Sequence, residues 1–98
     1  MYIKIHRSYR NVVAVCDTAL LGKKFEEGKR QLDVRENFFK GKDVDEKEAL
    51  KIFQLQFRED ATFNIVGEES VALALRAGII SEEGITTIQG ISFALKLM

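Results

Sequence analysis

The chain has no proline, no tryptophan and a single cysteine, Cys16. One cysteine forms no intramolecular disulfide and supplies no thiolate metal site by itself. Because His6 is also the only histidine, the composition argues against a structural zinc site, and we expect no metal or other cofactor. Without proline, the turns must depend on Gly, Asp, Asn and Ser, and the seven glycines lie between the periodic segments.

Long hydrophobic runs are also missing. The longest are Val12–Cys16 and Val71–Leu75, whereas a membrane-spanning helix needs about 20 apolar residues. The start of the sequence shows no secretory pattern either, because Lys4, His6 and Arg7 interrupt any apolar stretch. We therefore expect a cytoplasmic protein that has no membrane partner.

The length and composition that remain are those of one globular domain, residues 1–98. Hydrophobic residues make up 46% of the chain and charged residues 31%, so disorder is not expected. A domain of this size buries roughly two-thirds of the surface that its unfolded chain exposes. That suffices for one core and leaves little room for a deep cavity.

The charge is balanced overall but uneven along the chain. The net charge is zero, whereas residues 1–32 carry seven Lys or Arg and three Asp or Glu. A basic segment is typical of nucleic-acid-binding proteins, although charge along a sequence does not fix charge on a surface. An ordinary solvated surface is therefore the favoured interpretation, and RNA binding is the alternative.

Hydrophobic periodicity predicts the secondary structure. Ile3 and Ile5 alternate with Lys4 and His6, which predicts a half-buried strand whose polar face points to solvent. The same reasoning predicts strands over residues 2–6, 12–16, 31–34, 63–66, 85–89 and 91–97, and helices over residues 44–58 and 68–77. Together these elements indicate an α+β fold, with a single mixed β-sheet and two main helices packed against it.

Three local features refine this expectation. Asp43 is expected to cap the helix 44–58, with Glu46 three residues later closing a capping box. Residues 23–29 are polar except for Phe25, and residues 26–29 are interpreted as an exposed turn. The last strand, 91–97, is expected to offer an edge at which a second copy of the chain can pair.

The end of the second predicted strand is the first candidate site. There Cys16 is followed by Asp17, which is expected to cap a short turn at residues 18–21. A cysteine beside a helix N-terminus can become nucleophilic, and His6 is the one imidazole that could serve as its base. The alternative is that Cys16 packs as a small hydrophobic side chain and Asp17 acts only as a cap. The apolar run that ends at Cys16 favours this alternative.

A second strand-to-helix turn runs through Asn64, Gly67 and Glu68. A single glycine is a weak signal for phosphate binding, since the chain has neither a GxGxxG pattern nor a Walker-type Lys–Ser/Thr pair. Glu68 and Glu69 would also repel an anion, while they complement the positive end of the helix. Gly67 is therefore interpreted as a residue that the backbone geometry requires, and Glu68 as a helix-start residue.

Five basic residues form the candidate RNA-binding set: Lys4, Arg7, Arg10, Lys23 and Lys24. If the fold brings them together, Tyr9 and Phe25 lie among them and could stack on bases. No recognised RNA-binding signature accompanies them, so a solvated surface is again the favoured alternative.

Three segments match the signatures of a known family. They are Val15–Phe25, Phe38–Gly41, and Asn64–Glu68 followed by Val71. In order and approximate spacing they resemble the small archaeal family catalogued as domain of unknown function four hundred and twenty-four, and the resemblance covers nearly the whole chain. The candidate functional residues of the turns in these segments are Cys16, Asp17, Gly22, Asn64, Gly67 and Glu68.

The resemblance implies an archaeal, cytoplasmic protein that is loosely associated with translation and ribosome assembly, and it carries over no established activity. A Gly-Val-Pro-His-Ala-like segment is expected near the end of family members. Here the matching stretch is Gly90–Ala94, which has neither the proline nor the histidine. If that histidine were catalytic in relatives, this chain would lack it, which weakens an enzymatic interpretation.

Three functional hypotheses follow. The favoured one is a non-enzymatic binding module associated with translation or ribosome assembly, whose partner is RNA, a ribosomal particle or another protein. The second is a small enzyme with a site at the Cys16–Asp17 and Asn64–Glu68 turns, although no catalytic residue is assigned. The third is a homodimer that pairs through the C-terminal strand.

Overall fold

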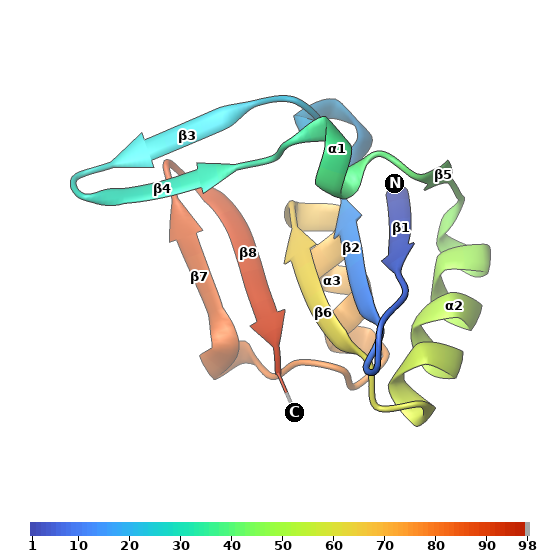
Figure 1. Cartoon of the computed structure of the whole chain (residues 1–98). Coiled ribbons are helices and arrows are strands. Elements are labelled where there is room, and N and C mark those ends of the chain that lie inside the picture. The colour runs from blue at the N-terminus through green and yellow to red at the C-terminus, as the bar shows by residue number, and fades with distance from the viewer. Residues whose placement is uncertain (98) are drawn as a thin grey trace.

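The structure, a computed structural model, describes residues 1–97 as one six-stranded sheet, a separate hairpin and helices (Figure 1). The sheet contains β1 Tyr2–His6, β2 Val12–Cys16, β5 Lys42–Asp43, β6 Thr62–Val66, β7 Ile85–Ile88 and β8 Ile91–Lys96. The hairpin is β3 Lys24–Glu27 with β4 Arg30–Asp33, and the helices are α1 Glu36–Phe39, α2 Glu46–Arg58 and α3 Glu68–Arg76, with 3-10 turns η1 Thr18–Leu20 and η2 Glu82–Gly84. The predicted α+β class, a mixed sheet with two main helices, is confirmed.

The sheet has the strand order β5-β1-β2-β6-β8-β7. Its central strands, β2 and β6, run parallel, and all other neighbouring pairs are antiparallel. Strand β2 is buried on both sides over most of its length, which explains why its sequence is an apolar run, whereas Thr62 and Asn64 of β6 are only half-buried. Because parallel strands end at the same edge, Cys16 pairs with Val66, and the two turns that follow lie side by side.

Helices α2 and α3 cover one face of the sheet, and the larger core cluster lies beneath them. Phe53 of α2 meets Phe63 of β6 edge to face, with the ring centroids 5.9 Å apart. Both side chains are fully buried, and burying a phenylalanine stabilises a fold by about 1.5–3 kcal/mol. Within the part of the chain that the structure describes, no helix is both long and apolar enough to cross a membrane.

The opposite face of the sheet is covered only at one end. There η1, the β3–β4 hairpin and α1 bury a smaller cluster that includes Cys16, Val34, Phe39 and Val66. Figure 1 shows the hairpin and α1 lying across the upper end of the sheet. Further along the strands, away from this cluster, Leu95 of β8 remains 55% exposed. The two faces of the sheet are therefore unequally covered.

Helix α2 begins two residues later than the sequence predicted. Its cap is Asp45, whose carboxylate accepts a hydrogen bond from the backbone N–H of Glu48 at 2.8 Å. Asp43 instead belongs to β5 and pairs with Tyr2 of β1. The capping-box pattern occurs twice, at Asp43–Glu46 and at Asp45–Glu48. Pairing with β1 selects the second, because Val44, which would be the first helical residue after Asp43, donates its N–H to the carbonyl oxygen of Met1.

The exposed turn predicted at residues 26–29 is present at Gly28 and Lys29, but Glu26 and Glu27 belong to strand β3, which the sequence did not predict. This strand pairs with β4, and Phe25 lies opposite Leu32. These two side chains are half-buried, while the other residues of both strands are exposed. The far end of the hairpin is tied to the β7–β8 turn, where the backbone N–H of Gln89 donates to the carboxylate of Glu27 at 2.8 Å. Strand β3 has a single apolar residue, Phe25, and this was too weak a signal to predict the strand from the sequence.

The C-terminal strand is not a sheet edge. Strand β8 lies between β6 and β7, so the prediction that a second copy pairs with residues 91–97 is wrong. The alternation along this strand is nevertheless present, because Ala94 is buried on the helix side and Leu95 is exposed on the other side. The alternating pattern, from which an edge strand was predicted, belongs here to an internal strand with one partly open face.

Candidate functional site

The two predicted turns meet through the side chain of Asp17. Its backbone N–H donates to the carbonyl oxygen of Val66 at 3.0 Å and so extends the β2–β6 pairing. Its carboxylate accepts hydrogen bonds from the backbone N–H groups of Glu69 (3.0 Å) and Ser70 (2.8 Å), and from the Ser70 hydroxyl (2.7 Å). Asp17 therefore caps α3, and it makes no side-chain cap to the turn at residues 18–21.

Gly67 explains why α3 needs a cap from another strand. It occupies the N-cap position of the helix with φ +108°, and glycine has no side chain with which to accept the first N–H groups. A Cβ at this position would overlap the carboxylate of Asp17. The positive φ and the close approach of Asp17 both require glycine here, as the interpretation of Gly67 as a backbone-geometry residue predicted.

Cys16 is fully buried beneath the hairpin and α1. Burial, reinforced by the negative charge of Asp17, raises the pKa of its thiol from 9.0 to about 11. The thiol is therefore protonated at neutral pH and is a poor nucleophile. His6 does not point freely to solvent as predicted: it is half-buried, it stacks on Phe38 with ring centroids 4.6 Å apart, and its Nε2 lies 2.9 Å from the Phe38 carbonyl oxygen.

Of the other predicted turn residues, Glu68 lines a hollow together with Asp17, whereas Gly22 and Asn64 do not. Gly22 opens the hairpin, where its N–H donates to the carbonyl oxygen of Val34 at 2.7 Å. Asn64 lies two residues before the end of β6, and Glu68 is exposed. A hollow of about 400 Å³ lies beside Asp17, between both turns and the β7–β8 turn. The charged side chains of its lining are all acidic, which is unfavourable for the anions that helix N-termini bind.

The five basic residues are not brought together. Arg7 and Arg10 lie exposed in the β1–β2 turn. Lys23 and Lys24 lie at the start of the hairpin, at the opposite end of the sheet (Figure 1). Lys4 is half-buried, and its Nζ donates to a backbone carbonyl oxygen of α1 at 2.8 Å. The structure therefore gives no single basic surface from this set.

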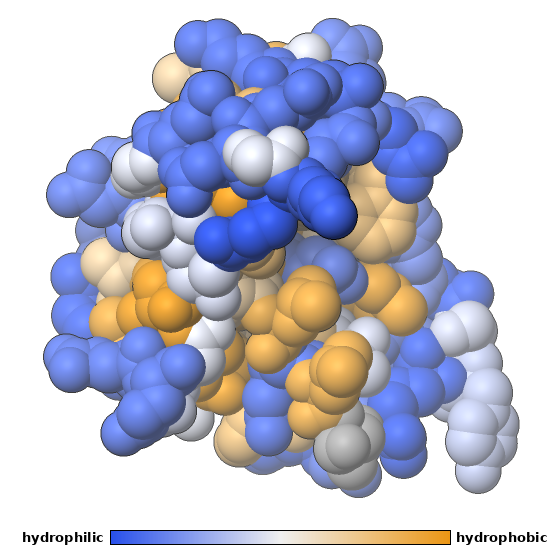
Figure 2. Space-filling model, turned by 90° about the vertical axis from the view of Figure 1, so that its left-hand side faces the viewer, coloured by the Kyte–Doolittle hydropathy of each residue, from blue (hydrophilic) through white to orange (hydrophobic). Residues whose placement is uncertain are grey.

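An apolar hollow lies where the hairpin and α1 leave the sheet uncovered, and we call it the sheet-face groove. It has a volume of about 300 Å³. Its apolar lining includes Leu32 of β4, Phe38 and Phe39 of α1, and Phe93 and Leu95 of β8. Figure 2 shows hydrophobic side chains gathered below the hydrophilic hairpin at the top of the molecule. Large apolar side chains and a hollow therefore coincide here, as they also do at a hollow of about 300 Å³ beside the exposed Phe57 of α2.

Three polar residues, Asp33, Arg35 and Asn64, complete the lining of the sheet-face groove. Asn64 is half-buried on the floor, between Ala14 of β2 and Leu95 of β8. Its side-chain amide takes part in none of the side-chain hydrogen bonds within residues 1–97. Arg35 is exposed and forms none of the ion pairs in the same residues. Both groups are free to bind a ligand.

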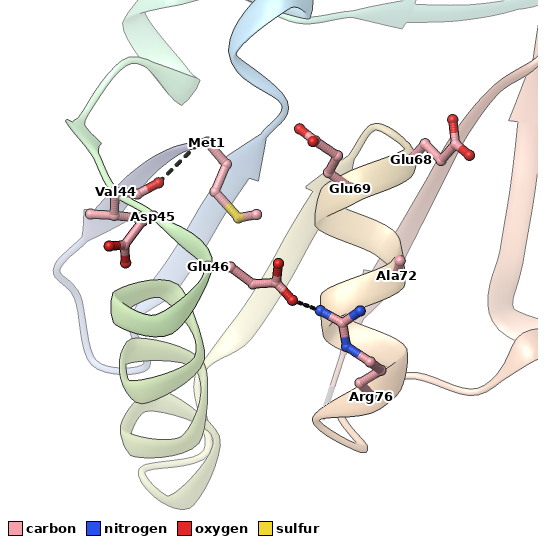
Figure 3. A pocket seen from close by; sticks show the side chains of 8 residues that line it. All are labelled: Met1, Val44, Asp45, Glu46, Glu68, Glu69, Ala72 and Arg76. Atoms are coloured by element: carbon pink, nitrogen blue, oxygen red, sulfur yellow. Dashed lines mark hydrogen bonds and ion pairs between the residues drawn. The ribbon is translucent and has the colours of Figure 1, made fainter.

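A further cleft, of about 500 Å³, lies between the start of α2 and the side of α3, along which its lining runs from Glu68 to Arg76 (Figure 3). Its charged lining is Asp45, Glu46, Glu68, Glu69 and Arg76. Glu46 and Arg76 point toward one another and form an ion pair across the cleft (Figure 3). The remaining charge is acidic, so phosphate groups would be repelled. No group of three or more His, Cys, Asp or Glu suited to a metal ion occurs in the described part of the chain.

Sequence reasoning missed the sheet-face groove, although one signal for it was present. Strand β8 stays apolar on one face through Phe93 and Leu95, whereas the segment that covers this face supplies only Phe25 and Leu32 from its two strands. A comparison of the two would have shown that the hairpin is too polar to cover the strand. No pattern in the sequence marked Arg35 as a residue of the groove.

The same fold occurs in a crystal structure described as that of an uncharacterized conserved protein from Methanopyrus kandleri. The two chains share 26% sequence identity and superimpose with a TM-score of 0.82, over 96% of this chain and 87% of the other. No curated protein matches the sequence. The sequence model of the family described as "Protein of unknown function (DUF424)" matches residues 6–97, which include the three signature segments, and the chain therefore belongs to that family, as the resemblance predicted.

Proposed function

We propose that this protein is a non-enzymatic binding module that holds a protein partner in the sheet-face groove. The observation that carries the proposal is the groove itself, an apolar hollow beside Leu95, which is 55% exposed. Large apolar side chains that stay exposed around a hollow are typical of interaction sites. A cytoplasmic role in translation or ribosome assembly, in an archaeal cell, is part of the proposal and is motivated by the family resemblance.

The distribution of charge favours a protein partner over RNA. RNA-binding surfaces concentrate basic side chains so that several phosphates are contacted at once. Here Lys24 lies 3.9 Å from the carboxylate of Glu26 and opposite Asp33 in the hairpin, so acidic neighbours offset its charge. Arg7 and Arg10 are at the other end of the sheet. The basic residues thus form no continuous surface for RNA, whereas the apolar side chains of the groove lie together.

The enzymatic alternative has weaker support from the geometry of the turns. The carboxylate of Asp17 already accepts three hydrogen bonds from α3, and the thiol of Cys16 is buried, with its pKa raised to about 11. Neither group is available as a base or nucleophile at neutral pH. Their proximity to Gly67 is explained by the capping of α3.

Co-sedimentation with ribosomal particles and with total RNA, over a series of salt concentrations, tests the proposal. Three variants are compared with the unaltered protein. Leu95→Asp places a charge in the groove, Leu55→Asp places the same charge on α2, where Leu55 is 49% exposed, and the double variant Lys23→Glu/Lys24→Glu reverses the hairpin charges. We expect the protein to sediment with ribosomal particles, and only Leu95→Asp to abolish this.

The outcomes separate the partner classes. Sedimentation that survives nuclease treatment and moderate salt is expected for a protein partner. A steep loss with salt, shared by the Lys23→Glu/Lys24→Glu variant, would indicate phosphate contacts and replace the protein partner by RNA. Equal loss in Leu95→Asp and Leu55→Asp, or no association under any condition, would contradict the proposed function.

A further inference from the structure

We propose that the β3–β4 hairpin is a hinged lid, which opens as one unit while the six-stranded sheet and the helices stay folded. Opening lengthens the sheet-face groove along β8. That the partner binds the surface uncovered in this way rests on the proposed function, whereas the opening itself does not. The attachment of the hairpin and the surface beneath it carry this inference.

The hairpin is connected to the rest of the chain at one end only. Both connections lie beside η1 and α1, and the turn of the hairpin lies at the far end, beyond β7 (Figure 1). At the connected end Gly22 has φ +83°, and its N–H donates to the carbonyl oxygen of Val34 at 2.7 Å. Val34 is fully buried and fixes this end in the core. Because glycine tolerates both signs of φ, Gly22 is suited to a hinge.

The two strands of the hairpin are bound to each other by a backbone ladder, whereas few groups attach them to the sheet. Each residue of β3 pairs with one of β4. Toward the sheet, the strands present one apolar residue each, Phe25 and Leu32, and both are only half-buried. Segments with few buried apolar contacts open locally at a lower free energy than the core does. The hairpin is therefore expected to move as a unit.

The far end of the hairpin is attached by two hydrogen bonds from one residue, Gln89 of the β7–β8 turn, and we call these bonds the latch. The backbone N–H of Gln89 donates to the carboxylate of Glu27 at 2.8 Å, and its side-chain amide donates to the backbone carbonyl oxygen of Glu26 at 2.7 Å. Both bonds are exposed to solvent, so water can replace either of them at a modest net cost. The latch can therefore break without unfolding of the sheet.

The surface beneath the hairpin is apolar and continues the floor of the sheet-face groove. Side chains alternate along a strand, so Ile91 of β8 lies on the same face as Phe93 and Leu95, which line the groove. Ile88 of β7 pairs with Ile91 and is 1% exposed, and both strands of the hairpin contact β7. Opening of the hairpin thus uncovers Ile88 and Ile91 and extends the apolar floor.

The accessibility of a single thiol beneath the hairpin tests this inference without any partner. The reporter protein combines Ile88→Cys with Cys16→Ala, and a second reporter combines Ile91→Cys with Cys16→Ala. Circular dichroism identifies the reporters that fold, and mass spectrometry follows their reaction with a thiol reagent at neutral pH. The unaltered protein is the comparison, because its Cys16 is buried in the cluster that also contains Val34.

Three further substitutions separate opening of the lid from unfolding of the whole chain. Glu27→Ala removes one acceptor of the latch. Glu26→Ala is its matched control, because Glu26 contributes only its backbone oxygen. Phe53→Ala removes a buried ring from the core under α2 and α3 and so raises the population of the unfolded chain. Low concentrations of urea serve the same purpose if Phe53→Ala does not fold.

We expect the thiol at position 88 to react more slowly than in the unfolded chain but much faster than Cys16. Glu27→Ala should accelerate its reaction roughly tenfold, as the loss of a charge-assisted hydrogen bond predicts, and Glu26→Ala should leave the rate unchanged. Phe53→Ala should accelerate the reaction of Cys16 and not that at position 88. Urea should also act more strongly on Cys16, because opening of the lid exposes less surface than unfolding does.

Three results would overturn the inference. Equal rates at position 88 and at Cys16, both raised alike by Phe53→Ala or urea, would mean that the hairpin opens only when the whole chain unfolds. A rate at position 88 equal to that of the unfolded chain would mean that the hairpin is not closed. A rate in Glu27→Ala no higher than in Glu26→Ala would exclude the latch. The co-sedimentation experiment decides the proposed function independently of all three.

Discussion

The face of the sheet beneath α2 and α3 differs from the face beneath the hairpin in how much apolar surface it leaves to water. Under the helices, Phe53 and Phe63 are fully buried and belong to a large cluster. Under the hairpin, the buried cluster is small, and Leu95 remains 55% exposed beyond it. The same strands serve both faces, so the difference comes from what covers them.

This difference indicates that one face of the sheet stabilises the fold and that the other is available for binding. Amphipathic helices bring several apolar side chains each, such as Ala49 and Phe53 of α2, and they seal their face of the sheet. The hairpin brings one apolar side chain per strand, Phe25 and Leu32. The face that α2 and α3 cover therefore stabilises the fold. We propose that the partly open face beneath the hairpin binds the partner.

The largest expected effect tests whether the sealed face supplies the stability. Phe53→Ala should lower the free energy of unfolding by about 3–5 kcal/mol, because it removes a buried ring and leaves a cavity. Leu95→Ala should change it by no more than about 0.5 kcal/mol, as for an ordinary surface substitution. Chemical denaturation followed by circular dichroism measures both. Similar losses of unfolding free energy in the two variants would show that the two faces of the sheet do not differ in their contribution to stability.

A second prediction concerns the contact between Gly67 and Asp17 at the end of the sheet. Gly67→Ala should destabilise the fold by about 3 kcal/mol, because alanine is strained at this positive φ and its Cβ would overlap the Asp17 carboxylate. In the background of Asp17→Ala the overlap is gone, so Gly67→Ala should cost less there. A double-mutant cycle measures the difference, and strictly additive costs would refute the contact.

The third prediction compares the two helix caps on the sealed face. Asp17→Ala should destabilise the protein by about 2 kcal/mol, at the upper end for a cap, since it removes three hydrogen bonds and leaves the buried hydroxyl of Ser70 without Asp17. Asp45→Ala removes one exposed cap bond and should cost about 1 kcal/mol. Thermal unfolding of both variants checks the order, and the reverse order would count against the long-range cap.

The last prediction concerns Cys16 beneath the hairpin, and its effect is confined to alkaline pH. Its thiol has an ordinary pKa of 9.0, and its folded pKa is about 11. Between these values the unfolded chain has released the proton while the folded chain keeps it, so the free energy of unfolding should fall as pH rises from about 9 to about 11. Below about pH 9 the Cys16 thiol is protonated in both states, so it does not make the free energy of unfolding depend on pH.

The matched variant for this prediction is Cys16→Ala, because other groups also titrate at alkaline pH. The difference in unfolding free energy between the two proteins should depend on pH only above about pH 9. Native-state labelling with a thiol reagent at neutral pH should be slow and should be accelerated by denaturant. Rapid labelling of the folded protein would mean that the hairpin does not seal Cys16.

Much of the fold was predictable because it depends on local periodicity. The alternation of Ile3 and Ile5 with Lys4 predicted β1, and the predicted helix 44–58 ends at Arg58, as α2 does. Local rules were weaker where two patterns competed. Asp43 and Asp45 both fit a capping box, and only the pairing of β5 with β1 distinguishes them.

The candidate site was less predictable because its contacts are long-range. Asp17 was predicted to cap the turn at residues 18–21, but its carboxylate caps a helix that begins about 50 residues later, at Glu68, and no local pattern indicates that contact. The sheet-face groove depends on what the hairpin fails to cover, and a sequence does not state which segment covers which face. Leu95 and Arg35 become neighbours only in the folded chain.

The most direct test of the account is site-specific crosslinking from the open face of the sheet. The photoreactive residue p-benzoylphenylalanine replaces Leu95 in one protein and Leu55 on α2 in another, and both are irradiated with ribosomal particles and cell extract. The account predicts a discrete adduct from position 95 that is sensitive to protease and resistant to nuclease, and none from position 55. Equal adducts from both positions, a nuclease-sensitive adduct, or none from position 95 would contradict it.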